Sequence, residues 1–366
     1  MAHQSFVYNP VSIGFDFAFF LSADGGVWCS GVEDNGGLGM GEDILDTGGR
    51  VVKLETLANI NFVSCGQGHS CFLNANGDVW MCGWNIYGQV GRPAHQTGIF
   101  YPEKITDIPK IRVLHTSFNH TIFLDFEGDV WTCGWNNNGQ LGIGSDSPEL
   151  RHTIEKIPNL RKIVAINAGT SFSYFIDEKG AVWTVGKQYK IEQVTGLPPI
   201  QFVSNRSLHS LFLDYNGSVW ARGANIKGQL GLGYYYGNMY DSKKVPSNEK
   251  FTAVSTGTSH SLFLNENGQV YVCGANQSGQ LGLGNNNNVC ELTLIPNLPV
   301  ISFICAGEEQ SVFVDTEGVC WVTGSNARGE LGDILSTATP TQIENLPPII
   351  HKQSRTQSTK SARNRY

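Results

Sequence analysis

The sequence lacks the features that mark membrane proteins and helical proteins. Its 366 residues contain no apolar stretch of the roughly 18 residues that a membrane-spanning helix needs. No segment repeats apolar residues with the 3.6-residue period of an amphipathic helix. The apolar run 11–23 has no basic leader and contains Asp16, so we interpret it as folded structure and not as a secretory signal. We therefore expect a β-rich chain without membrane contact.

Motifs of catalytic chemistry are also missing. No Ser/His/Asp order, nucleophile elbow or pair of carboxylates stands out. The glycine-rich segment 139–144 has no Lys-Ser or Lys-Thr ending and precedes no helix, so it does not fit a phosphate-binding loop. We predict no catalytic residue and no cofactor, and hence a protein that makes and breaks no covalent bonds.

The nine cysteines do not have the spacing of a metal site or a redox motif, because none forms a Cys-x-x-Cys pair. Several share a position with small or apolar residues in other parts of the sequence, as Cys133 does with Val185. This pattern predicts buried, reduced thiols, and therefore a cytoplasmic or nuclear protein.

Charge is divided unevenly along the chain. The net charge is −7, but residues 351–366 contain five basic side chains and no acid, so the first 350 residues carry 20 basic against 32 acidic groups. An acidic body repels phosphate backbones. We expect no nucleic-acid binding, except weakly through the basic tail.

What the sequence does contain is a repeat. The stretch 128–142 returns in seven copies, which align on a glycine that an aromatic residue follows by three positions. The glycines are Gly25, Gly77, Gly128, Gly180, Gly217, Gly268 and Gly318, and the aromatics are Trp28, Trp80, Trp131, Trp183, Trp220, Tyr271 and Trp321. A second series stands eight residues before each glycine: Phe17, His69, His120, Phe172, His209, His260 and Gln310. Two landmarks with one spacing indicate a repeat protein.

Each repeat predicts four short strands. In the third copy these are 102–105, 111–114, 120–124 and 130–133, separated by turn residues. Such a sheet cannot bury both faces alone, so the units must pack on one another, and a closed ring leaves only short edges. We predict an all-β, seven-bladed β-propeller of four-stranded antiparallel blades over residues 1–350, followed by a disordered tail at 351–366, and we expect a monomer.

The ring is expected to be closed by the N- and C-terminal strands. Val11–Gly14 and Pro340–Ile343 would complete one shared blade through main-chain hydrogen bonds, and Ile349 with Ile350 is the alternative for the second segment. The repeated tryptophans are expected to pack between blades.

The copies resemble a known family. Gly257-Thr258-Ser259-His260-Ser261 and Gly274-Ala275-Asn276-Gln277-Ser278-Gly279-Gln280-Leu281-Gly282 are similar to the repeat of the regulator of chromosome condensation family. The resemblance covers residues 11–350 and implies a seven-bladed propeller. It is weak evidence for function, because one fold serves unrelated partners.

Two functions follow as hypotheses. The first is a non-catalytic protein-interaction propeller that docks a partner protein on one ring face. The second, which the resemblance implies, is guanine-nucleotide exchange on a Ran-type small GTPase, an activity that needs no nucleophile. Family exchange factors carry an inserted hairpin in an early blade, whereas the second and third units here have no insertion.

Two other family activities are not expected. The plant ultraviolet-B photoreceptors place a tryptophan in a Gly-Trp-Arg-His-Thr stretch, which reads Gly66-Gln67-Gly68-His69-Ser70 here. The residues after the propeller are too few for a ubiquitin-ligase module.

The histidines of the second series invite a metal-site interpretation. They belong to separate units, and one position in different blades is spread around a ring, too far apart to share a zinc ion. We predict no metal site, and we expect each histidine to hydrogen-bond a neighbouring strand.

Departures from the repeat mark the candidate partner-binding residues. The fourth unit lacks the Asn-x-x-Gly-Gln-Leu-Gly link, and this predicts a notch on one face lined by Lys187, Tyr189 and Lys190, with neutral loop loss as the alternative. The link after the fifth unit contains clustered aromatics, which either form an interface or fold over the blade edge. These aromatics are Tyr234, Tyr235, Tyr236 and Tyr240. Trp84 and Trp135 occupy a position that varies among the units, so we expect two exposed aromatics on neighbouring blades.

Overall fold

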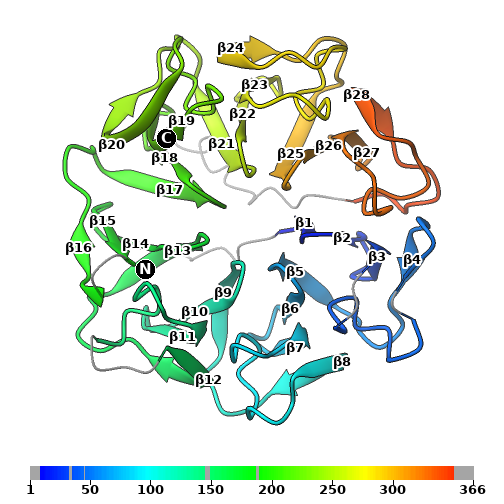
Figure 1. The fold of residues 1–366 in the computed structure, drawn as a ribbon, viewed down its shortest axis with the longest axis vertical. Coiled ribbons are helices and arrows are strands. Elements are labelled where there is room, and N and C mark those ends of the chain that lie inside the picture. Colours follow the sequence, from blue (N-terminus) through cyan, green and yellow to red (C-terminus); the bar gives the residue numbers. More distant parts are fainter. Residues whose placement is uncertain (1–8, 33–34, 45, 145–148, 187–188, 350–366) are drawn as a thin grey trace, which may run out of the picture.

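A ring of seven sheets makes up the computed structural model, which describes residues 9–32, 35–44, 46–144, 149–186 and 189–349. Each sheet has four antiparallel strands, and the sheets stand around a central axis as the blades of a propeller (Figure 1). The predicted fold class is confirmed. In the described ranges, no helix has the length and apolarity to cross a membrane. The predicted tail, 351–366, lies outside them.

The strands run from the central axis to the rim in sequence order within every blade. Blade 1 contains β1 (Val11–Ile13), β2 (Phe17–Leu21), β3 (Val27–Gly31) and β4 (Val52–Lys53); blade 2 contains β5 (Ile60–Cys65), β6 (His69–Asn74), β7 (Val79–Trp84) and β8 (Gly98–Ile105); blade 3 contains β9 (Ile111–Thr116), β10 (His120–Asp125), β11 (Val130–Trp135) and β12 (Leu150–Lys156). Blade 4 contains β13 (Ile163–Ala168), β14 (Ser173–Asp177), β15 (Val182–Val185) and β16 (Glu192–Gln193); blade 5 contains β17 (Ile200–Asn205), β18 (His209–Asp214), β19 (Val219–Asn225) and β20 (Tyr236–Lys244). Blade 6 contains β21 (Phe251–Thr256), β22 (His260–Asn265), β23 (Val270–Gly274) and β24 (Val289–Leu294); blade 7 contains β25 (Ile301–Ala306), β26 (Gln310–Asp315), β27 (Cys320–Gly324) and β28 (Thr337–Gln342).

The phase of the repeat differs from the predicted unit. The segment 102–105, which we placed first in the third unit, belongs to β8 at the rim of blade 2. Blade 3 instead begins with β9 at the central axis. Sequence periodicity defines the length of a unit, but hydrogen bonding decides which strands share a sheet.

A carboxylate organises the turn between the second and third strands. Asp125 Oδ1 accepts hydrogen bonds from the backbone N–H of Glu127 and Asp129, and its Oδ2 accepts one from the indole N–H of Trp131. The pairs Asp177–Trp183, Asp214–Trp220 and Asp315–Trp321 repeat this arrangement. The repeated tryptophans are half-buried against the hydrophobic core, so each packs one edge inward and keeps the other near solvent.

The core lies between the blades. The centre of every second strand contributes one fully buried phenylalanine that packs against its neighbours. These residues are Phe20, Phe72, Phe123, Phe175, Phe212, Phe263 and Phe313. All nine cysteines are free thiols, seven of them buried, which confirms their predicted packing role.

The repeated histidines join neighbouring blades. His120 Nε2 lies 3.0 Å from Ser173 Oγ of the next blade, and that hydroxyl donates to the carbonyl of Gln140 at 2.8 Å. His69 with Thr121, His209 with Ser261 and His260 with Ser311 form the same arrangement. The prediction of a structural histidine bonded to a neighbouring strand is confirmed.

The hydroxyl between these two partners determines the protonation of the ring. Because Ser173 uses its only proton on Gln140, it must accept from His120, and Nε2 therefore carries the proton of a neutral imidazole. Burial lowers the pKa of His120 to about 3, and it has the same effect on His69 and His260. A charged imidazole is excluded from this position at neutral pH.

Side-chain amides shape the links between the third and fourth strands. Asn136 Oδ1 accepts from the backbone N–H of Leu141, and Gln140 Oε1 accepts from that of Asn138. Gly139 takes a positive φ of 76°, which a glycine adopts without strain. The segment 139–142 is therefore a blade link, as its sequence context predicted.

Ring closure follows the alternative and not the shared blade that we favoured. Residues 337–342 form β28, the rim strand of blade 7, because they pair with β27. Ile349 takes the place that the first residue of a first strand takes in other blades. Its N–H donates to the carbonyl of Gly318 in blade 7 at 2.8 Å, as the N–H of Ile301, which begins blade 7, donates to Gly268 in blade 6. The preceding carbonyl, of Pro348, accepts from Ala23 of blade 1 at 3.3 Å. Ile350 lies outside the described residues.

The buried histidines should make folding sensitive to acid. Below pH 6.5 these histidines become protonated in the unfolded chain, whereas in the folded ring they stay neutral until about pH 3. The unfolding free energy should therefore fall as the pH drops through this window. His120→Gln, which introduces the residue found at position 310, should reduce the slope of unfolding free energy against pH by about one proton, or ~1.4 kcal/mol per pH unit. Urea unfolding between pH 4 and 7 measures the slope. An equal reduction in His95→Gln, at an exposed position, would contradict this origin.

Ile349 should contribute to stability far more than its terminal place suggests. Its side chain is fully buried in the cluster that joins blades 7 and 1. Ile349→Ala should lower the unfolding free energy by about 2–4 kcal/mol. Leu335→Ala, at a position that is 89% exposed, is the control and should leave it unchanged. Equal urea midpoints for the two variants would show that the ring closes elsewhere.

Candidate functional site

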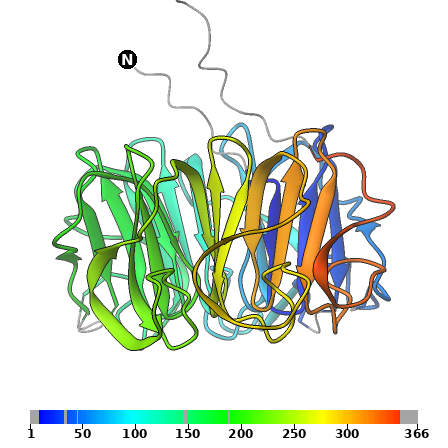
Figure 2. The same cartoon turned by 90° about the horizontal axis from the view of Figure 1, so that it is seen from above.

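The ring has two faces, which form the upper and lower edges of the side view in Figure 2. One, the link face, contains the turns between first and second strands and the links between third and fourth strands. The other, the hairpin face, contains the turns between second and third strands. Because Trp84 and Trp135 end third strands, both lie on the link face.

An aromatic row crosses blades 2 and 3 on the link face. The ring of Tyr87 lies 5.5 Å from Trp84 and 5.9 Å from Trp135, measured between centroids. All three side chains are half-buried. The two tryptophans lie on neighbouring blades as predicted, but they are less exposed than expected because Tyr87 fills the space between them.

Tyr189 extends this side of the ring toward blade 4. Its hydroxyl donates to the carbonyl of Asn137 at 2.9 Å, so the ring rests on the link of blade 3. Its backbone takes a positive φ of 60°, which is rare for a bulky residue. Lys190 is exposed beside it, and its ammonium lies 3.9 Å from Glu192. Lys187 lies outside the described residues.

The tyrosine cluster of blade 5 is exposed. Tyr235 folds over the neighbouring blade, where its hydroxyl donates to the carbonyl of Asn288 at 3.2 Å. Tyr234 precedes it on the link, Tyr236 begins β20, and Tyr240 projects from the same strand. The structure therefore divides this group: one ring leans on blade 6, and Tyr240, 79% exposed, contacts the solvent. The aromatic row and the cluster are on different blades and do not form one patch.

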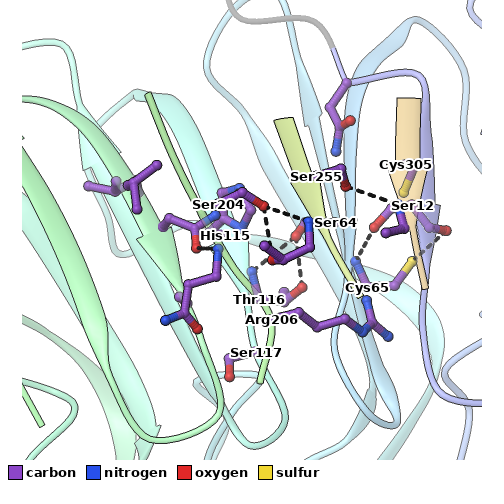
Figure 3. Close-up of a pocket in the computed structure, with 18 of the residues that line it drawn as sticks. Ser12, Ser64, Cys65, His115, Thr116, Ser117, Ser204, Arg206, Ser255 and Cys305 are labelled. Carbon is purple, nitrogen blue, oxygen red and sulfur yellow. Dashed lines mark hydrogen bonds between the residues drawn. The ribbon is translucent and has the colours of Figure 1, made fainter. Parts of the chain in front are cut away.

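The central channel forms a cavity of about 390 Å³ lined by the first strands (Figure 3). Side-chain oxygens in it hold adjacent blades together. Ser64 Oγ accepts from the backbone N–H of Thr116, and Ser204 Oγ accepts from that of Thr256, both at 3.0 Å. Since these hydroxyls are engaged, the wall of the channel is primarily structural.

Arg206 crosses the link-face mouth of the channel. It belongs to blade 5, yet its guanidinium donates to the carbonyls of Ile13 and Gly14 in blade 1, at 2.9 and 2.7 Å. Glu308 lies in the same mouth, and burial raises the pKa of its carboxyl to about 7 despite the opposing effect of the arginine. These two residues were missed by sequence reasoning. The sequence did contain a signal for Arg206, because it stands at a repeat position where other units have glycine, as at Gly66 and Gly257.

The four histidines of the second series do not converge. Each one joins its own blade to the next, so the four lie at four different seams. Across the described ranges, no three His, Cys, Asp or Glu side chains are grouped to hold a metal ion.

Comparison with known proteins identifies the repeat. Models of the regulator of chromosome condensation (RCC1) repeat match residues 60–89, 76–124, 127–176, 216–264, 251–280 and 267–314, which together are more than half of the chain. The chain belongs to the RCC1 repeat family. The predicted family is confirmed.

The curated relatives differ in how much of their own length the chain matches. The chain is 26% identical to the ultraviolet-B receptor UVR8 of Arabidopsis thaliana over 287 residues, which are 75% of this chain and 55% of the receptor. It is 29% identical to the human E3 ubiquitin-protein ligase HERC2 over 307 residues, 81% of this chain but 6% of the ligase. The chain thus spans about half of one relative and a small part of the other.

Two solved structures share the fold. Prp20p of Saccharomyces cerevisiae, described with its binding to Gsp1p and histones, superposes with a TM-score of 0.80 at 24% identity and covers 89% of this chain and 88% of its own. Human WBSCR16 superposes with a TM-score of 0.76 at 19% identity and covers 87% and 93%. At such identities the comparison supports the architecture alone.

Arg206 should hold the channel mouth of this RCC1 ring together. Arg206→Gly, which restores the residue common in the repeat, removes two hydrogen bonds to blade 1 and should cost about 1–3 kcal/mol of unfolding free energy. Arg328→Ala at the same face removes only an exposed ion pair with Asp16 and should cost under about 1 kcal/mol. Equilibrium urea unfolding compares the two. Equal costs would show that the cross-channel bonds add nothing.

Proposed function

We propose that the protein is a non-catalytic interaction ring that docks a partner protein on its link face. The observation that carries the proposal is the aromatic row, Trp84, Tyr87 and Trp135. Large aromatic side chains at the centre of a contact dominate interface energetics because they bury much area at low entropic cost. In this row the rings hold one another in place before any partner binds, which lowers the cost of ordering them.

The rigidity of the frame supports the same function. Neighbouring blades are joined by buried hydrogen bonds at the channel, at the histidines and at the links. Side chains on different blades are therefore held at fixed separations, as a docking surface requires. The aromatic row lies on third strands and one link, which belong to this frame. A partner would meet a surface that needs little rearrangement.

Nucleotide exchange on a Ran-type small GTPase is the second candidate. It is supported by the shared fold of Prp20p and by 30% identity over 128 residues to the canine X-linked retinitis pigmentosa GTPase regulator, of which this chain covers 13%. Exchange requires only that the nucleotide-free GTPase binds more tightly than the nucleotide-bound form, so the absence of a catalytic group is compatible with it. The second and third units carry no inserted segment in the sequence, which favours docking over exchange.

The docking proposal predicts the behaviour of a double variant. Trp84→Ala with Trp135→Ala should reduce capture of partner proteins by about tenfold or more, because two anchoring rings are removed. Quantitative capture from a cell extract on immobilised protein measures this, and equilibrium unfolding verifies that the ring remains folded. Tyr215→Ala, on the hairpin face at a position 62% exposed, is the matched control. Unchanged capture by the double variant would place the docking surface elsewhere.

The exchange proposal makes a separate prediction. Mixing the protein with a Ran-type GTPase loaded with fluorescent GDP should accelerate GDP release, and the double tryptophan variant should be slower if exchange uses the link face. No acceleration at micromolar protein would exclude exchange on that GTPase and would leave the docking proposal standing.

A further inference from the structure

The rim of blade 5 is uncovered where the other blades are covered. In the described part of the chain, six links lean on the outer portion of the following blade. A Cβ added to the link glycine would lie 2.6–2.8 Å from a Cα of that blade. The pairs are Gly36 with Phe100, Gly88 with His152, Gly139 with Tyr189, Gly228 with Cys290, Gly279 with Ala338 and Gly329 with Gly49. Four of these turns thus cover the rim strand of the next blade, and the turns on Tyr189 and Gly49 cover residues shortly before that strand.

Strand register identifies the residue that lacks this cover. In blades 6 and 7, Gly274 pairs with Val289 and Gly324 pairs with Thr337, and the covered residue is the next one along the rim strand. In blade 5, Gly223 pairs with Met239, so the equivalent residue is Tyr240. Phe100, His152, Cys290 and Ala338 are half-buried, whereas Tyr240 is 79% exposed.

The cause is the short link of blade 4. Six residues separate β15 from β16, whereas ten to twenty separate the equivalent strands of the other blades. The inner part of the seam is sealed by a substitute: Ser210, which would donate to the missing link, donates instead to the hydroxyl of Tyr174 at 3.1 Å. Asn205 Nδ2 in turn donates to Ser210 Oγ at 2.7 Å. The seam is closed inside, and only the rim surface around Tyr240 is open.

Charge indicates what would cover this surface. Residues 157–245, which form blades 4 and 5 with their loops, contain ten basic and five acidic side chains, whereas residues 1–156 contain eight against 17 and residues 246–350 contain two against ten. Lys243 and Lys244 are exposed on β20, and neither lies within salt-bridge distance of an acid in the described ranges. β20 carries Asp241 beside these two lysines, so its rim has an excess of one positive charge. A basic rim in an acidic ring favours an acidic occupant. The chain's own basic segment, 351–366, has the wrong charge to fill it.

We propose that the rim of blade 5 around Tyr240 binds an acidic, glycine-containing turn of a partner polypeptide. The turn would take the place that a link takes on six other rims, with its glycine against the backbone of β20 and its carboxylates near Lys243 and Lys244. A polypeptide is favoured over a nucleic acid because the six covered rims all receive a glycine turn. The proposal rests on the proposed function, that the ring docks partner proteins, and names the chemistry of one contact.

A direct binding assay tests this site. The probe is a fluorescein-labelled cyclic peptide that contains the sequence of residues 276–282 between two Glu-Asp pairs, and its binding is followed by fluorescence anisotropy. The wild-type ring should bind it, and Tyr240→Ala should weaken binding by about tenfold. Lys243→Glu with Lys244→Glu should weaken it further, and the loss should shrink as salt is added.

Controls separate the site from other surfaces. Tyr215→Ala, on the other face of the same blade, and the double tryptophan variant should bind the peptide as wild type does. If the double tryptophan variant still captures partner proteins as wild type does, and the peptide binds at the rim, the aromatic row would be rejected and not this rim.

Several outcomes would overturn the proposal. These are no binding at millimolar peptide, equal binding by Tyr240→Ala, equal binding of a peptide with Lys-Lys flanks, and equal binding of a peptide with alanine in place of its first glycine. Displacement of the peptide by single-stranded DNA would assign the basic rim to nucleic acid instead.

Discussion

A shared hydroxyl group between blades is the interaction on which this ring depends. Ser173 shows its logic, because one oxygen accepts from His120 of the preceding blade and donates to the carbonyl of that blade's link. The three groups satisfy one another only when two blades and a link are in register. Leaving such a buried group unpaired costs as much as several surface contacts contribute. The seams therefore select one packing of the blades and give a rigid frame.

The two exceptional seams show how far this constraint extends. At the seam between blades 7 and 1, Gln310 replaces the histidine and donates to Glu330 in the link of its own blade at 2.5 Å, while Ala18 of blade 1 stands where other blades have the hydroxyl. Between blades 4 and 5, Phe172 replaces the histidine, and the hydroxyl of Tyr174 replaces the missing link carbonyl. In both cases the substituted polar groups, Gln310 at one seam and the Tyr174 hydroxyl at the other, have a hydrogen-bond partner. In the interior, Tyr174 replaces the hydrogen bond that the missing link would have made, but in the described part of the chain no residue replaces its cover at the rim. The short link of blade 4 therefore changes the structure visibly only at the surface, around Tyr240.

The sequence predicted the architecture because its landmarks are set by local rules. Glycine turns and the Asp–Trp contact involve residues a few positions apart, and they recur in copy after copy. Our prediction of the closing segment was wrong because residues 340–343 have the composition of any short strand. Only their pairing with β27 shows that they belong to blade 7. Arg206 was missed for a related reason: its partners, Ile13 and Gly14, are more than 190 residues away and follow no repeat.

Recognition in this ring rests on departures from the repeat. A perfect sevenfold ring would present seven equal rims and no preferred orientation to a partner. Here blades 2 and 3 carry the aromatic row, blades 4 and 5 carry the excess of basic side chains, and the remaining blades are acidic. An approaching protein therefore experiences an electrostatic dipole across the ring before it contacts any side chain, and such a field orients encounters. The aromatic row and the open rim of blade 5 lie at different angles around the axis, so a partner that used both would be fixed in rotation as well as in face.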